Sequence, residues 1–517
     1  MSQVTYRANL SAKSFPFISA NWGRTIIVPQ YDNTYNRVLA SQADRDADVG
    51  IPQVYYCHNV MPHGQGFQTV GYTILTPGPG LGHIFAHIYL LRAVNDTKHY
   101  LVQANNGDLY LFNGTTWTFL FNKPFAQITV AYVSGNTYIY ISNIDFTGAA
   151  CAGGCYIYDP VTPTINVQAL TAVPIGTPLG IVGSAGYLIL YNSTQVAWSS
   201  TIDPTDFTPS LVTGAGYGSV EGTRGTIVGL VSHTLGFFVY TTANVVVGLY
   251  SGNSRFPFNF REIVGSGGIS SLSSVSVDAN TGNQYAYTTS GLQLISSTQT
   301  QTIFPEVTDF ISGQTFEDYD TITDTFVTQT ISTTLLKDIT VISDRYLVIS
   351  YGVTALTHAL VYDFILQRWG KLRIEHVKCF EYRLPNAGVT EIPRQSIAFL
   401  QTDGDIRRVN FSTEANWDPG YTTVIFLGKY QFVRQRLLQL DEVHIENVSP
   451  KGTFSVTNLY ALDGKNTQAE NGYLLDSAGE YRHYGFSNSI GVNHSLRIKG
   501  QILLESLVLV FHIDAKR

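Results

Sequence analysis

Two carboxylates in the stretch "AWSSTIDPTDFTPS", residues 197–210, have a spacing that could serve acid–base catalysis: Asp203 and Asp206 bracket a proline. A catalytic pair needs burial or neighbouring charges that separate the two pKa values. Asp-Pro also starts turns, because proline fixes φ and aspartate can bond to the backbone two residues on. Since a proline-rich loop usually leaves such side chains in solvent, we predict an inter-strand loop on the rim of a repeat unit.

A second acidic group, "FEDYD", places Glu317, Asp318 and Asp320 together. A calcium site would need more oxygen ligands at regular spacing and a glycine turn. The segment offers neither, and we predict a solvated acidic loop.

The histidines His83 and His87 in "GPGLGHIFAH" are four residues apart. This spacing would place both rings on one side of a helix, where they could bind a metal. The segment is instead typical of a turn that leads into a strand, and no acidic third ligand is close in sequence. We therefore expect structural roles for both histidines.

Cysteines and glycine-rich segments offer no catalytic motif. Cys151 and Cys155 in "AACAGGCY" predict two thiols or one local bridge in a loop, while Cys57 and Cys379 stand alone. A zinc site would need two further ligands nearby. The run "GSGGISS", residues 265–271, lacks the lysine of a P-loop, and neither a G-x-S-x-G elbow nor an Asp-box turn is present. We predict no catalytic, cofactor-binding or metal-binding residue and no enzyme activity.

The composition favours an all-β protein. Of the 517 residues 44% are hydrophobic and only 13% charged, with 32 Tyr, 28 Phe and 46 Gly. Strands favour aromatic and β-branched residues, and glycine supplies turns. The net charge is −7 and the cations are scattered, which argues against tight wrapping by nucleic acid, since that needs clustered cations. Neither a signal peptide nor a long apolar run for a membrane helix is visible.

An aromatic-led apolar run recurs along the middle of the chain. Six runs begin with an aromatic residue and a weaker seventh with isoleucine, at Tyr100, Tyr138, Tyr187, Phe237, Tyr285, Tyr346 and Ile397. The steps between them are 38, 49, 50, 48, 61 and 51 residues. Each run of about five residues leads through a polar turn to a second strand, as in a hairpin. The best pair aligns "GYLILYNSTQVA" with "GFFVYTTANVVV" without a gap.

A repeat of this length holds four short strands, which is one blade of a β-propeller. Radial stacking lets each blade cover the faces of its neighbours. Seven copies predict about seven blades, or six if a terminal copy belongs elsewhere. A series of β-sandwiches or a β-helix is the competing architecture.

The two ends of the chain lack the repeat. Residues 1–66 are polar and predict an extended N-terminal arm that contributes to a distant sheet. Residues 67–420 hold the propeller. From 421 to 517 the alternation in stretches such as "DEVHIENV" predicts antiparallel strands of a compact β-sandwich that forms a platform.

The order of these parts resembles the tail hub or nozzle proteins of short-tailed bacteriophages, also called packaged-DNA stabilisation proteins or tail tubular protein B. The resemblance rests on "NVMPHGQGFQTVGY" (59–72), "VAWSSTIDPTDF", the segment 262–296 with "GSGGISS" and "GLQLIS", and the late "ALVYDFILQRWGKL". The resemblance extends over nearly the whole chain, and it consists of the order of the parts and of these short sequence stretches.

The resemblance implies a virion protein of the phage tail, folded in the host cytoplasm and acting without catalysis or cofactor. Such proteins form a ring, usually a homohexamer, below the portal and adaptor. The ring encloses the DNA exit channel, retains packaged DNA and often holds tail fibres or spikes. A negative wall would let double-stranded DNA slide without sequence-specific binding. The alternative from a different class is a phage glycan-binding or depolymerase propeller, which would need two carboxylates about 5–10 Å apart in an aromatic groove.

Overall fold

The computed structural model describes residues 2–8, 25–28 and, with interruptions, 54–513; the interruptions longer than five residues are 143–153, 384–396, 412–422 and 447–453. Strands dominate these residues, as the composition predicts. The helical elements among them are the short helix α2 (Pro305–Ile311) and the 3-10 turn η1 (Leu272–Ser274). None of the described helices is long and apolar enough to cross a bilayer.

Five four-stranded antiparallel sheets follow one another along the chain, and we call them blades 1 to 5. Blade 1 comprises β6 (Phe85–Arg92), β7 (Lys98–Ala104), β8 (Asp108–Phe112) and β9 (Trp117–Asn122). Blade 2 comprises β10 (Ile128–Val133), β11 (Asn136–Ile141), β12 (Gly154–Asp159) and β13 (Thr164–Gln168). Blade 3 comprises β14 (Gly180–Ser184), β15 (Tyr187–Tyr191), β16 (Gln195–Trp198) and β17 (Gly216–Ser219). Blade 4 comprises β18 (Ile227–His233), β19 (Gly236–Thr241), β20 (Val245–Tyr250) and β21 (Phe258–Glu262). Blade 5 comprises β22 (Val275–Val277), β23 (Gln284–Thr288), β24 (Gly291–Ile295) and β25 (Thr300–Thr302).

Two further blades complete the ring. Blade 6 comprises β28 (Asp338–Ile342), β29 (Tyr346–Gly352), β30 (Leu356–Asp363) and β31 (Arg368–His376). Blade 7 comprises β32 (Lys378–Glu381), β33 (Ile397–Leu400) and β34 (Ile406–Phe411), and its fourth strand is β5 (Gly66–Thr76) from the other end of the propeller sequence. A hairpin of β4 (Val60–His63) with β5 joins blades 6 and 7 into one sheet, because β4 pairs with β31.

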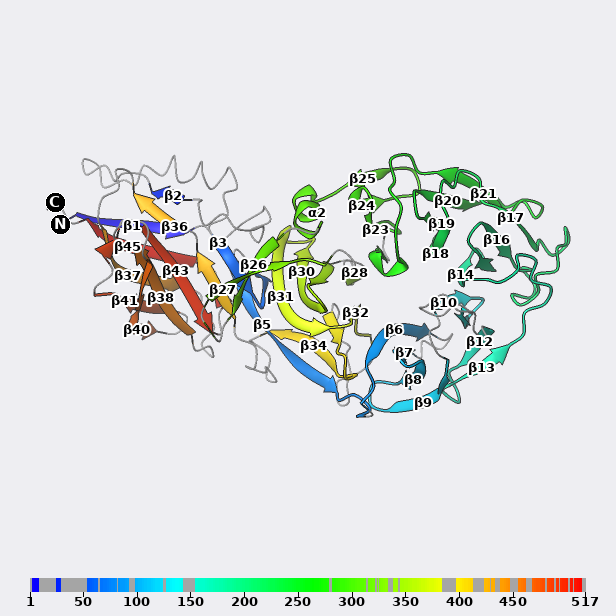
Figure 1. Cartoon of the computed structure of the whole chain (residues 1–517), viewed down its shortest axis with the longest axis horizontal. Coiled ribbons are helices and arrows are strands. Elements are labelled where there is room, and N and C mark those ends of the chain that lie inside the picture. Colours follow the sequence, from blue (N-terminus) through cyan, green and yellow to red (C-terminus); the bar gives the residue numbers. More distant parts are fainter. Residues whose placement is uncertain are drawn as a thin grey trace.

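The blades close into a ring, which confirms a β-propeller (Figure 1). First strands of consecutive blades contact one another: β6 with β10, β10 with β14, β14 with β18, β22 with β28, β28 with β32, and β32 with β6. The remaining neighbours, β18 and β22, share one apolar cluster. Seven such units make a seven-bladed propeller, and each aromatic-led run of the sequence lies in the second strand of its blade.

The core consists of apolar layers between neighbouring blades. The layer between blades 1 and 2, for example, joins Leu101 and Leu111 to Ile139 and Tyr156. The layer between blades 3 and 4 joins Tyr187 and similar side chains to Phe237. Blade faces alternate along each strand, so every second residue serves the preceding blade and the others serve the following one.

This alternation corrects one detail of the sequence alignment. The ungapped alignment matched Gly186 with Gly236, a step of 50 residues. The turn that precedes the second strand ends at Tyr187 in blade 3 and at Gly236 in blade 4, so equivalent positions are 49 residues apart. A slip of one residue exchanges the two faces of a strand, and the alignment therefore paired residues that face opposite neighbours.

The longest step between the repeats has a structural cause. The long step of 61 residues spans an insertion between blades 5 and 6, which holds α2 and the hairpin of β26 (Thr315–Asp320) and β27 (Thr325–Thr330).

The segment "AWSSTIDPTDFTPS" lies in the connection between β16 and β17, which confirms an inter-strand loop.

A second domain, the platform, is built from both ends of the chain (Figure 1). One sheet contains β1 (Ser2–Ala8), β45 (Ser506–Ile513), β37 (Leu438–Glu446), β41 (Tyr481–Gly485), β40 (Tyr473–Ala478) and β42 (Ile490–Gly491). The other contains β2 (Thr25–Val28), β36 (Lys429–Phe432), β43 (Asn493–Gly500), β35 (Val424–Leu427), β3 (Val54–His58), β38 (Phe454–Ala461) and β39 (Thr467–Asn471). The short β44 (Leu503–Leu504) pairs with β5 of the propeller.

The platform sheets share one apolar cluster, as in a β-sandwich. Val443 and Tyr484 of the first sheet and Val456 and Ile498 of the second belong to it. The same cluster continues into blades 5 and 6 through residues such as Leu347. The propeller and the platform are therefore packed against each other through a continuous apolar core.

The glycine-rich run 265–271 packs closely between blades 4 and 5. A Cβ at Gly268 would lie 2.1 Å from the carbonyl carbon and oxygen of Thr242. The amide of Gly268 donates to Thr289 Oγ1 at 3.1 Å, and its carbonyl accepts from the amide of Thr289 at 2.8 Å. The run thus serves close backbone approach between blades and does not cradle a phosphate.

We predict that Gly268→Ala lowers the apparent melting temperature by several degrees. The added methyl meets backbone, and overpacking of this kind costs about 1–3 kcal/mol. Gly218→Ala is the matched control, because a Cβ there meets nothing within 4 Å. Thermal unfolding of both variants, followed by intrinsic fluorescence, checks this; equal melting temperatures for the two would contradict the close packing.

Candidate functional site at the propeller–platform junction

Asp203 and Asp206 cap turns. Asp203 Oδ1 accepts from the amide of Thr205 at 2.9 Å, and Asp206 Oδ1 accepts from the amide of Thr208 at 2.9 Å. Hydrogen bonds from Thr208 lower the pKa of Asp206. Each side chain thus bonds to the backbone two residues on, and the interpretation as a structural loop is confirmed.

The prediction of a solvated acidic loop at residues 316–320 is wrong. Thr315–Asp320 is strand β26, and Asp318 is buried with 2% of its surface exposed. Its neighbour Asp320 is partly exposed and accepts from Thr323 Oγ1 at 2.8 Å. The side chain of Glu317 lies outside the described residues. Alternation places Asp318 and Asp320 on the same face of β26, so the sequence gives no sign that Asp318 is buried while Asp320, at the end of the strand, stays partly exposed.

Asp318 is surrounded by basic side chains from blade 6. Its Oδ2 lies 3.2 Å from His358 Nε2 and 3.4 Å from Arg373 Nη2, and its Oδ1 lies 4.0 Å from Lys371 Nζ. Burial alone would raise the pKa of Asp318. The hydrogen bond from His358 and the charges of these basic groups outweigh burial and hold the pKa far below its usual range.

Two of the three basic partners are buried as well. His358 and Lys371 are each 2% exposed, and burial lowers the pKa of both. The His358 ring stacks on Tyr351 with a centroid separation of 5.2 Å. A carboxylate at this position compensates cations that would otherwise be costly to bury.

The cluster connects the β26–β27 hairpin to the platform. Arg373 Nη1 donates to the carbonyl of Tyr319 at 2.9 Å, and Arg497 Nη1 of β43 donates to Tyr319 Oη at 2.8 Å. The Tyr319 ring also packs on Phe426 of β35 at 4.9 Å between centroids. One strand therefore presents a carboxylate to the propeller and an aromatic ring to the platform.

Asn59, between β3 of the platform and β4 of the propeller hairpin, is a second connection. It is buried and adopts a positive φ of 56°, a conformation that asparagine tolerates better than most residues. Its Oδ1 accepts from the amide of Arg373 at 2.8 Å and from Tyr72 Oη at 3.1 Å. Its carbonyl accepts from Thr423 Oγ1 at 3.2 Å. The chain therefore enters the propeller through a residue bonded to β5, to blade 6 and to the start of the C-terminal segment.

Chemistry on a substrate does not suit this cluster. Asp318 and His358 resemble a catalytic dyad in spacing, but both side chains are buried and a substrate would need access to them. The nearby Cys57 thiol is fully buried, which raises its pKa well above the usual value and disfavours the reactive thiolate. What the arrangement can do is hold two domains in a fixed orientation.

The two histidines singled out by spacing have different partners. His83 Nε2 lies 3.3 Å from Asp108 Oδ2. This acidic neighbour is not close to His83 in the sequence, so the spacing of residues did not indicate it. His87 lies in β6, where burial foremost and then the charge of Lys378 lower its pKa to about 4. It is neutral at pH 7.

The cysteines form no described bridge. Cys57, Cys155 and Cys379 are buried free thiols, and burial raises the pKa of Cys155 to about 12. Cys151 lies outside the described residues.

One cluster was not indicated by any motif. Among the described residues, Glu442, His444 and His483 form a group whose ligand atoms all lie within 4.8 Å of one another. Glu442 and His444 are two apart in β37, but His483 joins them only through strand pairing. The alternation in "DEVHIENV" indicates that Glu442 and His444 share a face. The sequence does not show that this strand pairs with "EYRHYGF", and that pairing is needed to bring His483 to the other two residues.

No family model and no curated protein matches the sequence. Among solved structures the chain is similar to YCF48 from Cyanidioschyzon merolae, with 12% identity and a TM-score of 0.38 over 65% of this chain and 98% of that chain. The fold follows from the sheet topology above and not from this likeness.

We predict that Asp318→Asn lowers the free energy of unfolding by about 3 kcal/mol or more, because it leaves buried cations uncompensated. The control Asp320→Asn, in the same strand, should cost less than about 1 kcal/mol. Urea denaturation at pH 7 measures the free energy of unfolding of both variants and of the wild type.

The loss of stability caused by Asp318→Asn should also depend on pH. A carboxylate whose folded-state pKa is lowered stabilises the fold above its unfolded pKa, near 4, and loses this contribution as the pH falls further. The difference in the free energy of unfolding between the wild type and Asp318→Asn should therefore be largest at pH 7 and become smaller as the pH falls below 4. A difference that widened below pH 4 would contradict the ionised state of Asp318.

Proposed function

We propose that this protein is a structural virion subunit of a short-tailed phage, several copies of which form the tail nozzle ring around the DNA exit channel. In this proposal the ring is a homohexamer that attaches to the portal and adaptor, retains packaged DNA and holds tail fibres or spikes. The proposal extends the resemblance of the sequence to nozzle proteins, and the following features support it.

The observation that carries the proposal is the way in which the two domains are joined. A closed propeller is connected to a platform made from both chain ends by the buried charges around Asp318 and by Asn59. A conduit subunit must keep its shape while DNA under pressure passes. A buried, hydrogen-bonded junction suits this mechanical role better than the solvated hinge that a mobile domain would need.

The edge of the platform offers a surface for neighbouring subunits. β40 ends the order of its sheet, and three consecutive apolar residues on it are half-exposed: Tyr473 at 52%, Leu474 at 52% and Leu475 at 47%. An edge strand presents backbone groups that another chain can pair with. We assign this edge to contacts between copies.

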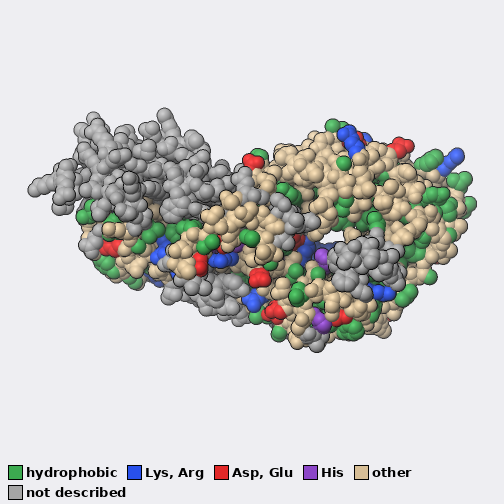
Figure 2. Space-filling view, in the orientation of Figure 1, with side chains coloured by type: hydrophobic (Ala, Val, Ile, Leu, Met, Phe, Trp, Pro, Cys, Tyr) green, Lys and Arg blue, Asp and Glu red, His purple; other side chains and the backbone are tan. Residues whose placement is uncertain are grey.

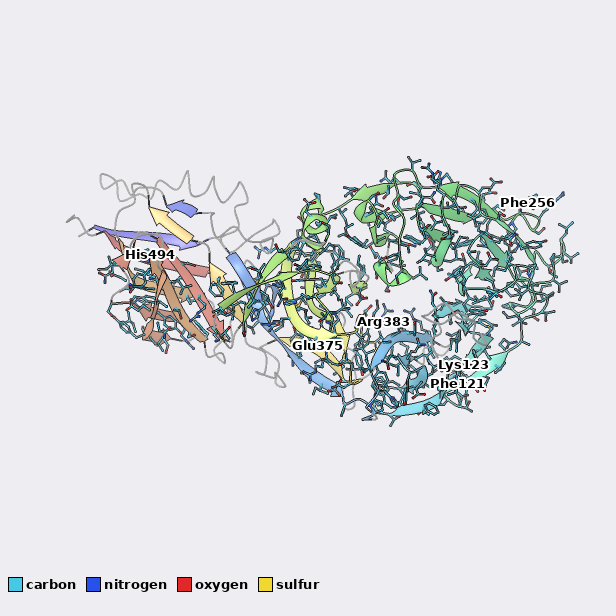
Figure 3. All side chains as sticks on the ribbon, in the orientation of Figure 1. Phe121, Lys123, Phe256, Glu375, Arg383 and His494 are labelled. Carbon is cyan, nitrogen blue, oxygen red and sulfur yellow. The ribbon has the colours of Figure 1, made fainter. Side chains whose placement is uncertain are left out.

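The opposite end of the molecule is also apolar. Ile202, Leu211 and Val212 in the β16–β17 loop and Phe256 in the β20–β21 loop are 61–89% exposed. The two loops adjoin, since a Cβ built on Gly214 would lie 3.7 Å from the carbonyl oxygen of Ser254. Figures 2 and 3 show hydrophobic side chains and Phe256 along the propeller edge farthest from the platform. Apolar groups that gather in this way are typical of interaction sites, and we assign them to a fibre or another tail protein.

We predict that the double variant Leu474→Asp, Leu475→Asp stays monomeric under conditions in which the wild type forms rings. The introduced charges would be buried at the interface without partners. The control Val264→Asp, Ile365→Asp changes two exposed propeller residues and should assemble normally. Mass photometry of the purified chain, alone and with the portal–adaptor ring, measures assembly.

Location and activity assays separate this proposal from the glycan-depolymerase alternative. Electron microscopy of labelled phage particles should place the chain in a ring at the tail, and no sugar should be released from host polysaccharide. Release of oligosaccharide by the wild type, lost in Asp203→Asn or Glu317→Gln, would instead support the enzyme.

A further inference from the structure

We infer that Glu442, His444 and His483 bind one first-row transition-metal ion of the Zn²⁺ class on the outer face of the platform sheet. The inference is independent of the nozzle proposal, since it rests on two strands of one sheet. These strands, β37 and β41, are antiparallel neighbours that pair His444 directly with His483.

A β-bulge turns Glu442 and His444, which share a face, away from the core of the platform. The register of β37 against β45 shifts between Leu440 and Glu442. Leu440 is buried before the bulge, and Val443 and Ile445 are buried after it. Without the extra residue, alternation would put Glu442 on the face of Leu440; the bulge reverses the phase, so that Glu442 and His444 point away from the core. Bulges often redirect side chains in this way at functional positions.

The ligand atoms are already spaced for a shared metal ion. Glu442 Oε2 lies 3.0 Å from His444 Nε2 and 3.1 Å from His483 Nε2, and the imidazole centroids are 4.2 Å apart. Zinc binds nitrogen and carboxylate oxygen at about 2.0–2.2 Å. Two ligands at such lengths and near-tetrahedral angles are separated by slightly more than 3 Å, so small side-chain rotations would admit the ion.

The ligand types favour a transition metal over calcium or magnesium. Imidazole suits zinc, copper, iron and nickel, whereas the hard cations prefer oxygen. Both rings present Nε2 toward one carboxylate. The three side chains are partly exposed, at 35%, 27% and 20%, so an ion can enter and a remaining coordination position stays open to water.

The competing arrangement is a glutamate that simply accepts hydrogen bonds from two histidines. A carboxylate accepts, so each ring donates through an Nε2–H in the metal-free state; on binding, the metal occupies Nε2 and the neutral ring carries its hydrogen on Nδ1 instead. Measurement of metal binding distinguishes the two arrangements.

The test is calorimetric titration of ZnCl₂ into untagged full-length protein that has been stripped with a chelator and desalted. The wild type should bind one Zn²⁺ per chain at this site. His444→Ala, His483→Ala and Glu442→Gln should each weaken binding, by at least the roughly tenfold that loss of even an outer-shell partner costs. Excess Ca²⁺ or Mg²⁺ should not compete.

His83→Ala is the matched control, because His83 has one carboxylate partner, Asp108, at 3.3 Å. It should leave Zn²⁺ affinity and stoichiometry unchanged. Bound Co²⁺ provides a second readout, since its visible absorption should appear in the wild type and His83→Ala and vanish in the His444→Ala, His483→Ala double variant. Far-ultraviolet circular dichroism confirms that the variants fold. Equal Zn²⁺ binding by wild type and the folded double variant would overturn the inference, as would the absence of binding by the wild type.

Discussion

Burial of apolar surface between neighbouring sheets is the constraint on which this structure depends. A four-stranded blade with residues such as Ile189 and Leu190 on opposite faces cannot shield both faces alone. Each face is covered by the next blade, so stability requires a closed ring. The closing strand β5 comes from the start of the propeller sequence and pairs with β34 at its end. Closure of the ring therefore depends on pairing of the first and last strands of the propeller sequence, and the chain segments beyond these two strands build the platform.

Much of this fold could be predicted from the sequence, because the second strand of most blades is a continuous apolar run that begins with an aromatic residue. The aromatic starts at Tyr100 or Tyr346 mark such strands without any knowledge of packing. The closing partner of β34 could not be predicted in this way, since pairing between residues more than three hundred positions apart leaves no local pattern. The one-residue slip between blades 3 and 4 has a similar origin: both strands are buried on both faces, and a continuous apolar run does not reveal which face a residue serves.

The candidate site residues could be predicted where their partners are close in the sequence, but not where the fold brings distant partners together. Asp203 and Asp206 were predictable because their partners are two residues away. Asp318 was misjudged because it lies in an inserted hairpin while its partners His358, Lys371 and Arg373 come from blade 6, and a charged residue in a polar sequence gives no sign of burial. His483 likewise reaches Glu442 only through strand pairing. Local chemistry is readable from local sequence, whereas an electrostatic cluster assembled by the fold is not.

Closure of the propeller also limits where such a protein can bind others. A closed ring hides most sheet edges within and between blades, so contacts with partners fall to loops and to the platform. Two groups of exposed apolar side chains fit this division: one lies in the loops after β16 and β20, and the other on the edge strand β40. The buried charges at Asp318 lie between these two ends. Since a rigid junction transmits displacement between its ends, a partner bound at the far loops in the proposed ring would act on neighbours at β40 through the Asp318 cluster.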